Sequence, residues 1–214
     1  MGAHLLGQVK RLQIMTETIL AVFSQEESAV APMEYHGIYR PLIDAIEMFR
    51  DEASFKNCDI LEPVAVGTPR FPDIEMNLFE LTLAFKNLIH NAIKYSYKPP
   101  KNLDRNRFIR VGGEWYDKEK RFYCINIQNY GVGISSEEIA SRIIFKPFHR
   151  GIYSGDRNRT GSGIGLGFVA KIVEERHHGK IFVVSIPQGG GAHLTTFRIV
   201  LPVCQAKEKK GSSK

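Results

Sequence analysis

The chain has 214 residues, of which 43% are hydrophobic and 24% are charged, and its formal net charge is +6. This length accommodates one or two domains with a buried core, and the composition excludes collagen-like, low-complexity and wholly disordered chains. No apolar run approaches the roughly 18–20 residues of a membrane helix, and residues 1–20 lack the layout of a signal peptide.

The positive charge is concentrated in two short segments. Residues 203–214 carry a net charge of +3 and residues 142–160 a net charge of +4, which leaves −1 for the remainder. A nucleic-acid-binding face needs basic residues spread over it, so we expect no nucleic-acid partner. Cys58, Cys124 and Cys204 lie far apart and form no CxxC pair. They indicate neither a disulfide framework nor a zinc site and favour a cytoplasmic location, in a parent protein that can still be membrane-anchored.

Residues 3–23 are predicted to form an N-terminal helix. From Leu12 the apolar residues recur at steps of three and four, through Met15 and Ile19 to Val22. This is the spacing of a coiled-coil seam, but an amphipathic helix packed on its own domain has the same pattern, and both interpretations stay open. The polar residues 24–28 then indicate a boundary.

Helical and extended segments alternate irregularly in the next part of the chain. A second helix is expected from about Pro41 to Lys56, because proline is tolerated in a first helical turn. Residues 59–66 are predicted to form one strand, which Pro63 places at a sheet edge. The strongest helix pattern spans about 77–96, with Asn77 and Glu80 spaced as in a variant capping box.

The C-terminal half contributes more strands than helices. Strands are predicted at 108–115 and 121–128, and the Gly161–Gly167 loop opens a helix that ends near His177. Two further strands, at 180–186 and 194–201, are joined by the turn at Gly189–Gly191. This order predicts an α+β fold, with a mixed, mostly antiparallel sheet and helices on one face.

The helix over 77–96 carries a polar stripe. Asn87, Asn91, Lys94 and Tyr95 are spaced so that they share one helix face. A carboxamide oxygen is a hard ligand suited to Mg²⁺, and a lysine supplies a point charge for phosphate. A solvated helix face remains an equally good explanation of this stripe taken alone.

Three glycine- or phenylalanine-containing stretches follow. Asn129-Tyr-Gly131-Val-Gly133-Ile134 comes directly after a predicted strand, and its glycines would allow a flat ligand to approach the backbone. Phe145-Lys-Pro-Phe148-His-Arg150 precedes a loop rich in Gly, Ser and Arg. The sequence from 161 to 167, GSGIGLG, leads into a helix and offers backbone N–H groups to an anion, without the pattern of a P-loop or a Rossmann fold.

In this order, the four stretches resemble the N, G1, F and G2 boxes of the GHKL (Bergerat-fold) ATP-binding superfamily. Within it, the chain is similar to the catalytic (HATPase_c) domain of two-component sensor histidine kinases. The matching stretches are NLIHNAIKYS, NYGVGI, IIFKPFHRG and GSGIGLGFVAKIVEERHHGKI. The resemblance covers about residues 33–202 and implies a two-layer α/β sandwich that binds ATP or ADP under a mobile lid at about 149–162.

The resemblance also implies a role for each matching residue. Asn91 corresponds to the Mg²⁺ ligand, and Asn87, Lys94 and Arg150 to the catalytic residues around the phosphates. The cofactor-binding residues implied are Asn87, Asn91, Lys94, Tyr95, Asn129, Gly131, Gly133, Ile134, Phe145, Phe148, Arg150, Gly161, Ser162, Gly163, Ile164, Gly165 and Leu166. Residues 1–25 resemble the end of a dimerisation hairpin, positions 37–56 its connecting helix, and 203–214 a disordered basic tail.

Two features depart from the family pattern. The G1 box usually has Asp where this chain has Asn129, and an amide lacks the charge with which Asp accepts a hydrogen bond from adenine. No phosphoacceptor histidine segment is visible in the chain. The expected function is therefore phosphoryl transfer from ATP to a histidine on a dimerisation domain outside this chain, and then to a response regulator receiver domain, within a homodimeric parent protein.

Two alternatives have different consequences. A GHKL ATPase would carry a glutamate four residues before the magnesium asparagine, where this chain has Asn87, which cannot act as a base. A degenerate module that binds nucleotide or docks a regulator without catalysis is the other alternative, and Asn129 is the reason to consider it.

Overall fold

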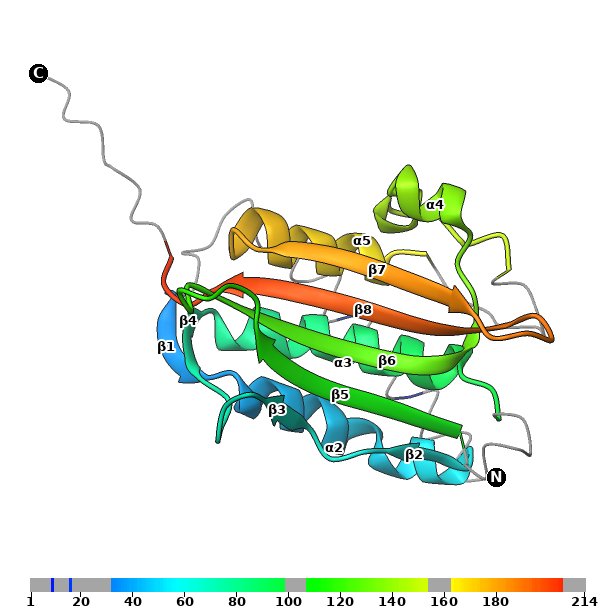
Figure 1. Cartoon of the computed structure of the whole chain (residues 1–214), viewed down its shortest axis with the longest axis horizontal. Helices are drawn as coiled ribbons and strands as arrows, with labels where there is room; N and C mark the ends of the chain where they lie inside the picture. Colours follow the sequence, from blue (N-terminus) through cyan, green and yellow to red (C-terminus); the bar gives the residue numbers. More distant parts are fainter. Residues whose placement is uncertain (1–8, 10–15, 17–31, 99–106, 154–162, 206–214) are drawn as a thin grey trace, which may run out of the picture.

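In the computed structural model, a six-stranded sheet runs through the domain (Figure 1). The structure describes residues 32–98, 107–153 and 163–205, together with Val9 and Thr16. The strands of the sheet are β2 (Cys58–Ile60), β3 (Val64–Val66), β5 (Arg107–Trp115), β6 (Phe122–Val132), β7 (Lys180–Pro187) and β8 (Ala192–Pro202). The order is β2–β5–β6–β8–β7, and β3 also pairs with β5. The pairs β5–β6, β6–β8 and β7–β8 are antiparallel, whereas β2 and β3 run parallel to β5.

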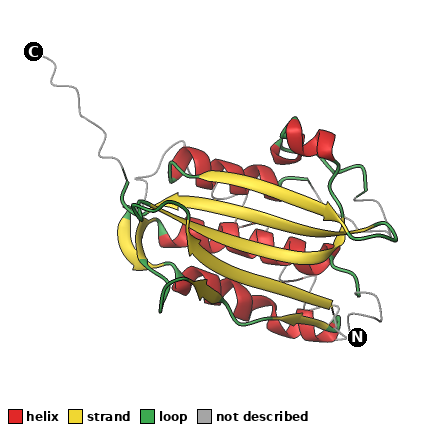
Figure 2. Cartoon of the chain, in the orientation of Figure 1, coloured by secondary structure: helices red, strands yellow, loops and turns green. Residues whose placement is uncertain are grey.

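Helices cover one face of this sheet. Figure 2 shows α2 (Tyr39–Phe55), α3 (Leu78–Tyr95) and α5 (Gly165–Ala170) together behind the strands. A π-helical segment, Lys171–Arg176, continues α5. The short helix α4 (Ser136–Ala140) lies beyond β7, and β1 (Glu34–Gly37) pairs with β4 (Asp73–Met76) in a separate two-stranded sheet. The predicted α+β sandwich with a mixed, mostly antiparallel sheet and helices on one face is confirmed.

The core lies between the two layers. Large side chains from α2, α3 and the middle strands are almost completely buried there, among them Leu42, Phe49, Leu81, Phe85, Leu88, Ile109, Tyr123, Ile125 and Ile199. Burial of each such apolar side chain contributes about 1.5–3 kcal/mol. Helix α3 packs on β5 and β6 across this core, and α5 packs in turn on α3.

Several predicted boundaries need correction. The strand expected at 59–66 is two strands. The pairing with β5 is interrupted after Leu61, whose N donates to Ile109 O, and Pro63 has no N–H to donate. Both pieces lie at the sheet edge, as Pro63 predicted. The strand expected to end at 128 continues as β6 to Val132, because β8 pairs with it along its whole length. Helix α5 begins at Gly165, within the glycine-rich stretch that was predicted to open it.

The helix expected near 37–56 exists as α2, but it packs within the domain and does not serve as a linker to a dimerisation hairpin. Leu42, Ala45, Ile46 and Phe49 bury its inner face in the core, and α2 packs along α3. It is an integral helix of the sandwich. Sequence analysis did not predict β1, β4 or α4. Most of the expected N-terminal helix, most of the basic tail, and Gly161 and Ser162 lie outside the described residues.

Candidate functional site

The polar stripe of α3 begins with a buried amide. Asn77 caps the helix by accepting a hydrogen bond from Glu80 N at 3.0 Å. Almost three turns further along, Asn87 is buried and its Nδ2 donates to Leu83 O at 3.0 Å. With Nδ2 engaged, Oδ1 lies against Gly165, where an added Cβ would be 2.7 Å away. Asn87 therefore marks the contact between α3 and the start of α5.

The rest of the stripe is half-buried along the same face of α3. Asn91 and Lys94 follow Asn87 by one and two turns, and the Lys94 ammonium lies 4.5 Å from the centre of the Tyr95 ring. The structure thus places Asn87, Asn91 and Lys94 in one row along α3, and the row starts where Asn87 contacts Gly165.

The C-terminal end of α3 is held on β6 through glycine. Ser96 pairs with Gly131, and Tyr97 N donates to Tyr130 O at 2.7 Å. A Cβ at Gly131 would collide with the Tyr95 carbonyl and lie 2.8 Å from Ser96 Cα. At Gly131, the group that approaches the glycine closely is therefore the protein's own backbone at Tyr95 and Ser96. This contact fixes the polar stripe of α3 over the end of β6.

Asn129 lies on the same face of β6 as Gly131 and belongs to a polar row. Its side chain is 4% exposed, and among the described residues its Nδ2 has no hydrogen-bond partner. Across the strands, Asn129 is opposite Thr195, and Thr195 is opposite Ser185. All three side chains face the helices. In each strand, a residue two positions before or after points to the same face and is apolar.

Ser185, Thr195 and their neighbour His193 were not among the site residues predicted from the sequence. Ser185 Oγ accepts from Ile134 N at 3.1 Å and lies 3.0 Å from Thr195 Oγ1 and 3.1 Å from His193 Nδ1. The His193 ring fills the space above Gly133. A polar residue at an inward position of each of three neighbouring strands was the available signal, but it requires the strand register to be known.

The F and G2 stretches pack on each other. Phe145 is half-buried against the core, and Gly167 lies under its carbonyl. Phe148 is 76% exposed, and its left-handed backbone (φ 65°) turns the chain over Gly163, which is itself at φ +74°. Ile164 caps α5 and Leu166 packs against the core, while Arg150 lies exposed beyond Phe148.

A buried carboxylate holds the described beginning of the predicted lid. Glu138, in α4, forms a capping box with Ser135 and also accepts hydrogen bonds from Ile152 N at 2.9 Å and His149 Nε2 at 3.2 Å. Burial would raise the pKa of Glu138, but the hydrogen bonds from Ile152, Ser135 and His149 lower it below its usual value. The carboxylate is thus kept charged and bound to residues 149–152.

His177, which sequence analysis did not single out, fixes the other end of α3. Its ring is 0% exposed, with Nδ1 2.9 Å from Ile172 O and Nε2 accepting from Asn77 N at 3.1 Å. The expected capping box is therefore only half present: Glu80 pairs with Arg176 at 3.1 Å instead of returning to Asn77 N. Burial, together with the Arg176 cation, lowers the pKa of His177 to about 4.

The polar side chains of α3 suit a hard metal ion that takes few protein ligands and is held mainly by the phosphates of a bound nucleotide. Within the described ranges, no group of three or more His, Cys, Asp or Glu side chains could hold a metal. Asn91 offers an amide oxygen on the half-buried stripe beside Asn87. Such a site fits Mg²⁺, which keeps few protein ligands and completes its shell with phosphates and water.

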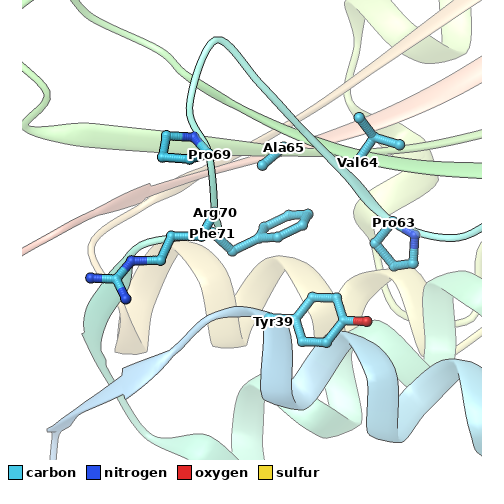
Figure 3. Close-up of a pocket in the computed structure, with 7 residues that line it drawn as sticks. All are labelled: Tyr39, Pro63, Val64, Ala65, Pro69, Arg70 and Phe71. Carbon is cyan, nitrogen blue, oxygen red and sulfur yellow. The ribbon is translucent and has the colours of Figure 1, made fainter.

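A separate cavity lies beside β3, at the edge of the sheet where β2 and β3 pair with β5. Its volume is about 520 Å³, and Figure 3 shows Tyr39, Pro63, Val64 and Phe71 around it with the Arg70 side chain directed outward. None of the predicted site residues lines it. No helix in the described part of the chain has the length and apolar run needed to cross a membrane.

Comparisons with known proteins agree with this arrangement. The sensor histidine kinase CpxA of Escherichia coli (strain K12) is 28% identical over 141 residues, which cover 65% of this chain but only 28% of CpxA. The catalytic domain of the histidine kinase ThkA has the same fold, with a TM-score of 0.60 and 17% identity over 81% of this chain and 99% of that domain. ThkA in complex with the response regulator protein TrrA gives a TM-score of 0.60 and 17% identity, covering 91% of this chain and 49% of that chain.

The chain therefore spans less than a third of the length of CpxA. The sequence model of one family, described as histidine kinase-, DNA gyrase B- and HSP90-like ATPase, matches residues 77–205. That range contains the polar stripe of α3, Asn129 and the glycines of α5. With this match over more than half of its length, the chain belongs to the histidine kinase-, DNA gyrase B- and HSP90-like ATPase family.

Proposed function

We propose that this chain binds Mg·ATP and transfers the γ-phosphate to a histidine on a dimerisation domain outside the chain. ATP would lie between α3 and the start of α5, with its base toward Asn129 and its phosphates toward Gly165. Asn91 would hold the Mg²⁺, which neutralises phosphate charge when bound. Lys94 and Arg150 would add positive charge around the phosphates, as phosphoryl transfer requires.

The position of Asn87 is the observation that carries the proposal. It lies against Gly165, where a hydrolase of this superfamily would need a carboxylate to activate water, and its amide is bonded to Leu83 O. An amide cannot take a proton near neutral pH. The nearby acid, Glu80, is two turns away and paired with Arg176. The chain's own residues therefore favour transfer to an external nucleophile over hydrolysis.

The partners follow from the same reading. The acceptor imidazole would come from the dimerisation domain of a homodimeric parent protein. A receiver domain would take the phosphoryl group next. The support for a response regulator as the partner is that ThkA, which shares this fold, was solved in complex with the response regulator protein TrrA. The chain would work in the cytoplasm, where ATP is available and free thiols such as Cys58 and Cys124 stay reduced.

A phosphotransfer assay tests this function. The purified chain is mixed with γ-labelled ATP, Mg²⁺ and the parent's separately produced dimerisation domain. We expect label on that domain's histidine and little released phosphate without the domain. Tight ATP binding without transfer would instead favour a nucleotide-binding docking module, the second candidate, to which Asn129 points. Rapid phosphate release without the domain would favour an ATPase.

A further inference from the structure

Asn129 is a buried donor without an acceptor. The side chain is 96% buried, and Nδ2 finds no partner among the described residues. Its cross-strand neighbours do not supply one. Ile109 is apolar, and the Thr195 hydroxyl is engaged by Ser185 Oγ at 3.0 Å and lies 3.4 Å from Val132 O. A buried N–H group of this kind calls for an acceptor from a ligand or water.

A carboxamide recognises a purine differently from a carboxylate. A carboxylate only accepts, so it pairs with the 6-amino group of adenine and opposes the 6-oxo group of hypoxanthine or guanine. A carboxamide carries a donor and an acceptor, and rotation of the amide by half a turn exchanges them. It can accept from a 6-amino group in one orientation and donate to a 6-oxo group in the other.

No described neighbour holds the Asn129 amide in one orientation. Gln128, the preceding residue of β6, shows the contrast on the opposite face: its Oε1 accepts from Arg110 at 3.1 Å, and its Nε2 donates to Thr196 at 2.9 Å. The protein therefore fixes the orientation of the Gln128 amide through both of its ends. At Asn129, Nδ2 is unpaired, so a bound ligand can determine the orientation of the amide.

We propose that this nucleotide site accepts 6-oxopurine nucleoside triphosphates as well as ATP, and that Asn129 determines this breadth. The inference rests on the proposed function, because it assigns a base to the same site. The inference concerns recognition of the group at position 6 of the purine. A protein that leaves a buried hydrogen-bonding group unpaired against this position binds the wrong base much more weakly.

The test compares ATP with inosine triphosphate, whose base has a 6-oxo group and an N1 proton but adds no 2-amino group. Binding of each is measured by calorimetry with Mg²⁺ for the wild-type chain, Asn129→Asp and Gln128→Glu. The last variant adds the same charge one residue away on the opposite face of β6. Circular dichroism checks that each variant is folded.

We expect the wild-type dissociation constants for the two nucleotides to differ by less than about tenfold. Asn129→Asp should weaken inosine triphosphate by about tenfold or more and leave ATP equal or tighter. Gln128→Glu should leave the ratio unchanged.

Each alternative outcome is decisive. ATP binding with inosine triphosphate weaker by about tenfold or more in the wild type would overturn this inference and leave the proposed function standing. The same ratio in the wild type and a folded Asn129→Asp would show that Asn129 is not the determinant. Failure of both nucleotides to bind would overturn the proposed function itself. If Asn129→Asp does not fold, the wild-type ratio alone decides the breadth.

Discussion

Lowering the pH should destabilise the domain through His177. The ring is buried and neutral in the folded chain, with a pKa of about 4 against 6.5 when unfolded. The unfolded chain therefore binds a proton more readily between these values, so stability is complete above pH 6.5 and falls as the pH decreases. At about 1.4 kcal/mol per pKa unit, the total loss is about 3 kcal/mol, of which about 2 kcal/mol falls between pH 7 and pH 5.

The groups around the His177 ring explain why no neighbouring negative charge stabilises its protonated form. Arg176 and His178 oppose a positive charge on His177, and the Glu80 carboxylate, at 4.0 Å, is already paired with Arg176. Protonation would also remove the acceptor for Asn77 N at the start of α3.

Urea denaturation at pH 5 and pH 7 measures the effect, with His177→Gln as the matched variant. Glutamine can still accept from Asn77 N but does not titrate. The wild type should lose about 2 kcal/mol more than His177→Gln over this interval. Equal losses for both proteins would refute the assignment of the acid sensitivity to His177.

Three further perturbations test other parts of the site. Gly131→Ala should cost about 1–3 kcal/mol in urea denaturation, because its Cβ meets the Tyr95 carbonyl, whereas Gly112→Ala, with only an ordinary contact to Val64 O, should cost less. Equal costs would contradict the contact between α3 and β6. Asn91→Ala should abolish Mg²⁺-dependent ATP binding in calorimetry, and Thr82→Ala, an α3 change outside the polar stripe, should retain it; equal affinities would remove Asn91 as the metal ligand. Glu138→Ala should speed hydrogen exchange at the Ile152 amide at least tenfold, consistent with the roughly 1.5–3 kcal/mol of a hydrogen bond to a charged group. Unchanged exchange there would show that the carboxylate does not hold this segment.

The sequence was informative where local patterns decide the outcome. The periodicity of α3, its Asn77 cap and the glycine turn at 189–191 depend on residues close in the chain, and the structure contains all three. Short elements were missed because they depend on distant partners: β1 and β4 exist only as a pair. The strand boundary at 128 was wrong because pairing with β8, more than sixty residues away, extends β6 to Val132.

The candidate site divides in the same way. The helical spacing placed Asn87, Asn91, Lys94 and Tyr95 on one face without further information. The roles of Ser185 and Thr195 depend on strand register, and that of His177 depends on the return of the chain to the start of α3. No local pattern contains these contacts.

The ratio of histidine phosphorylation to phosphate release tests the central claim most directly. Under single-turnover conditions, γ-labelled ATP, Mg²⁺ and the chain are combined with the dimerisation domain, and both products are followed over time. We predict that label accumulates on the histidine faster than free phosphate appears, and that omission of the domain leaves ATP largely intact. Equal phosphate release with and without the domain, with no labelled histidine, would contradict the account.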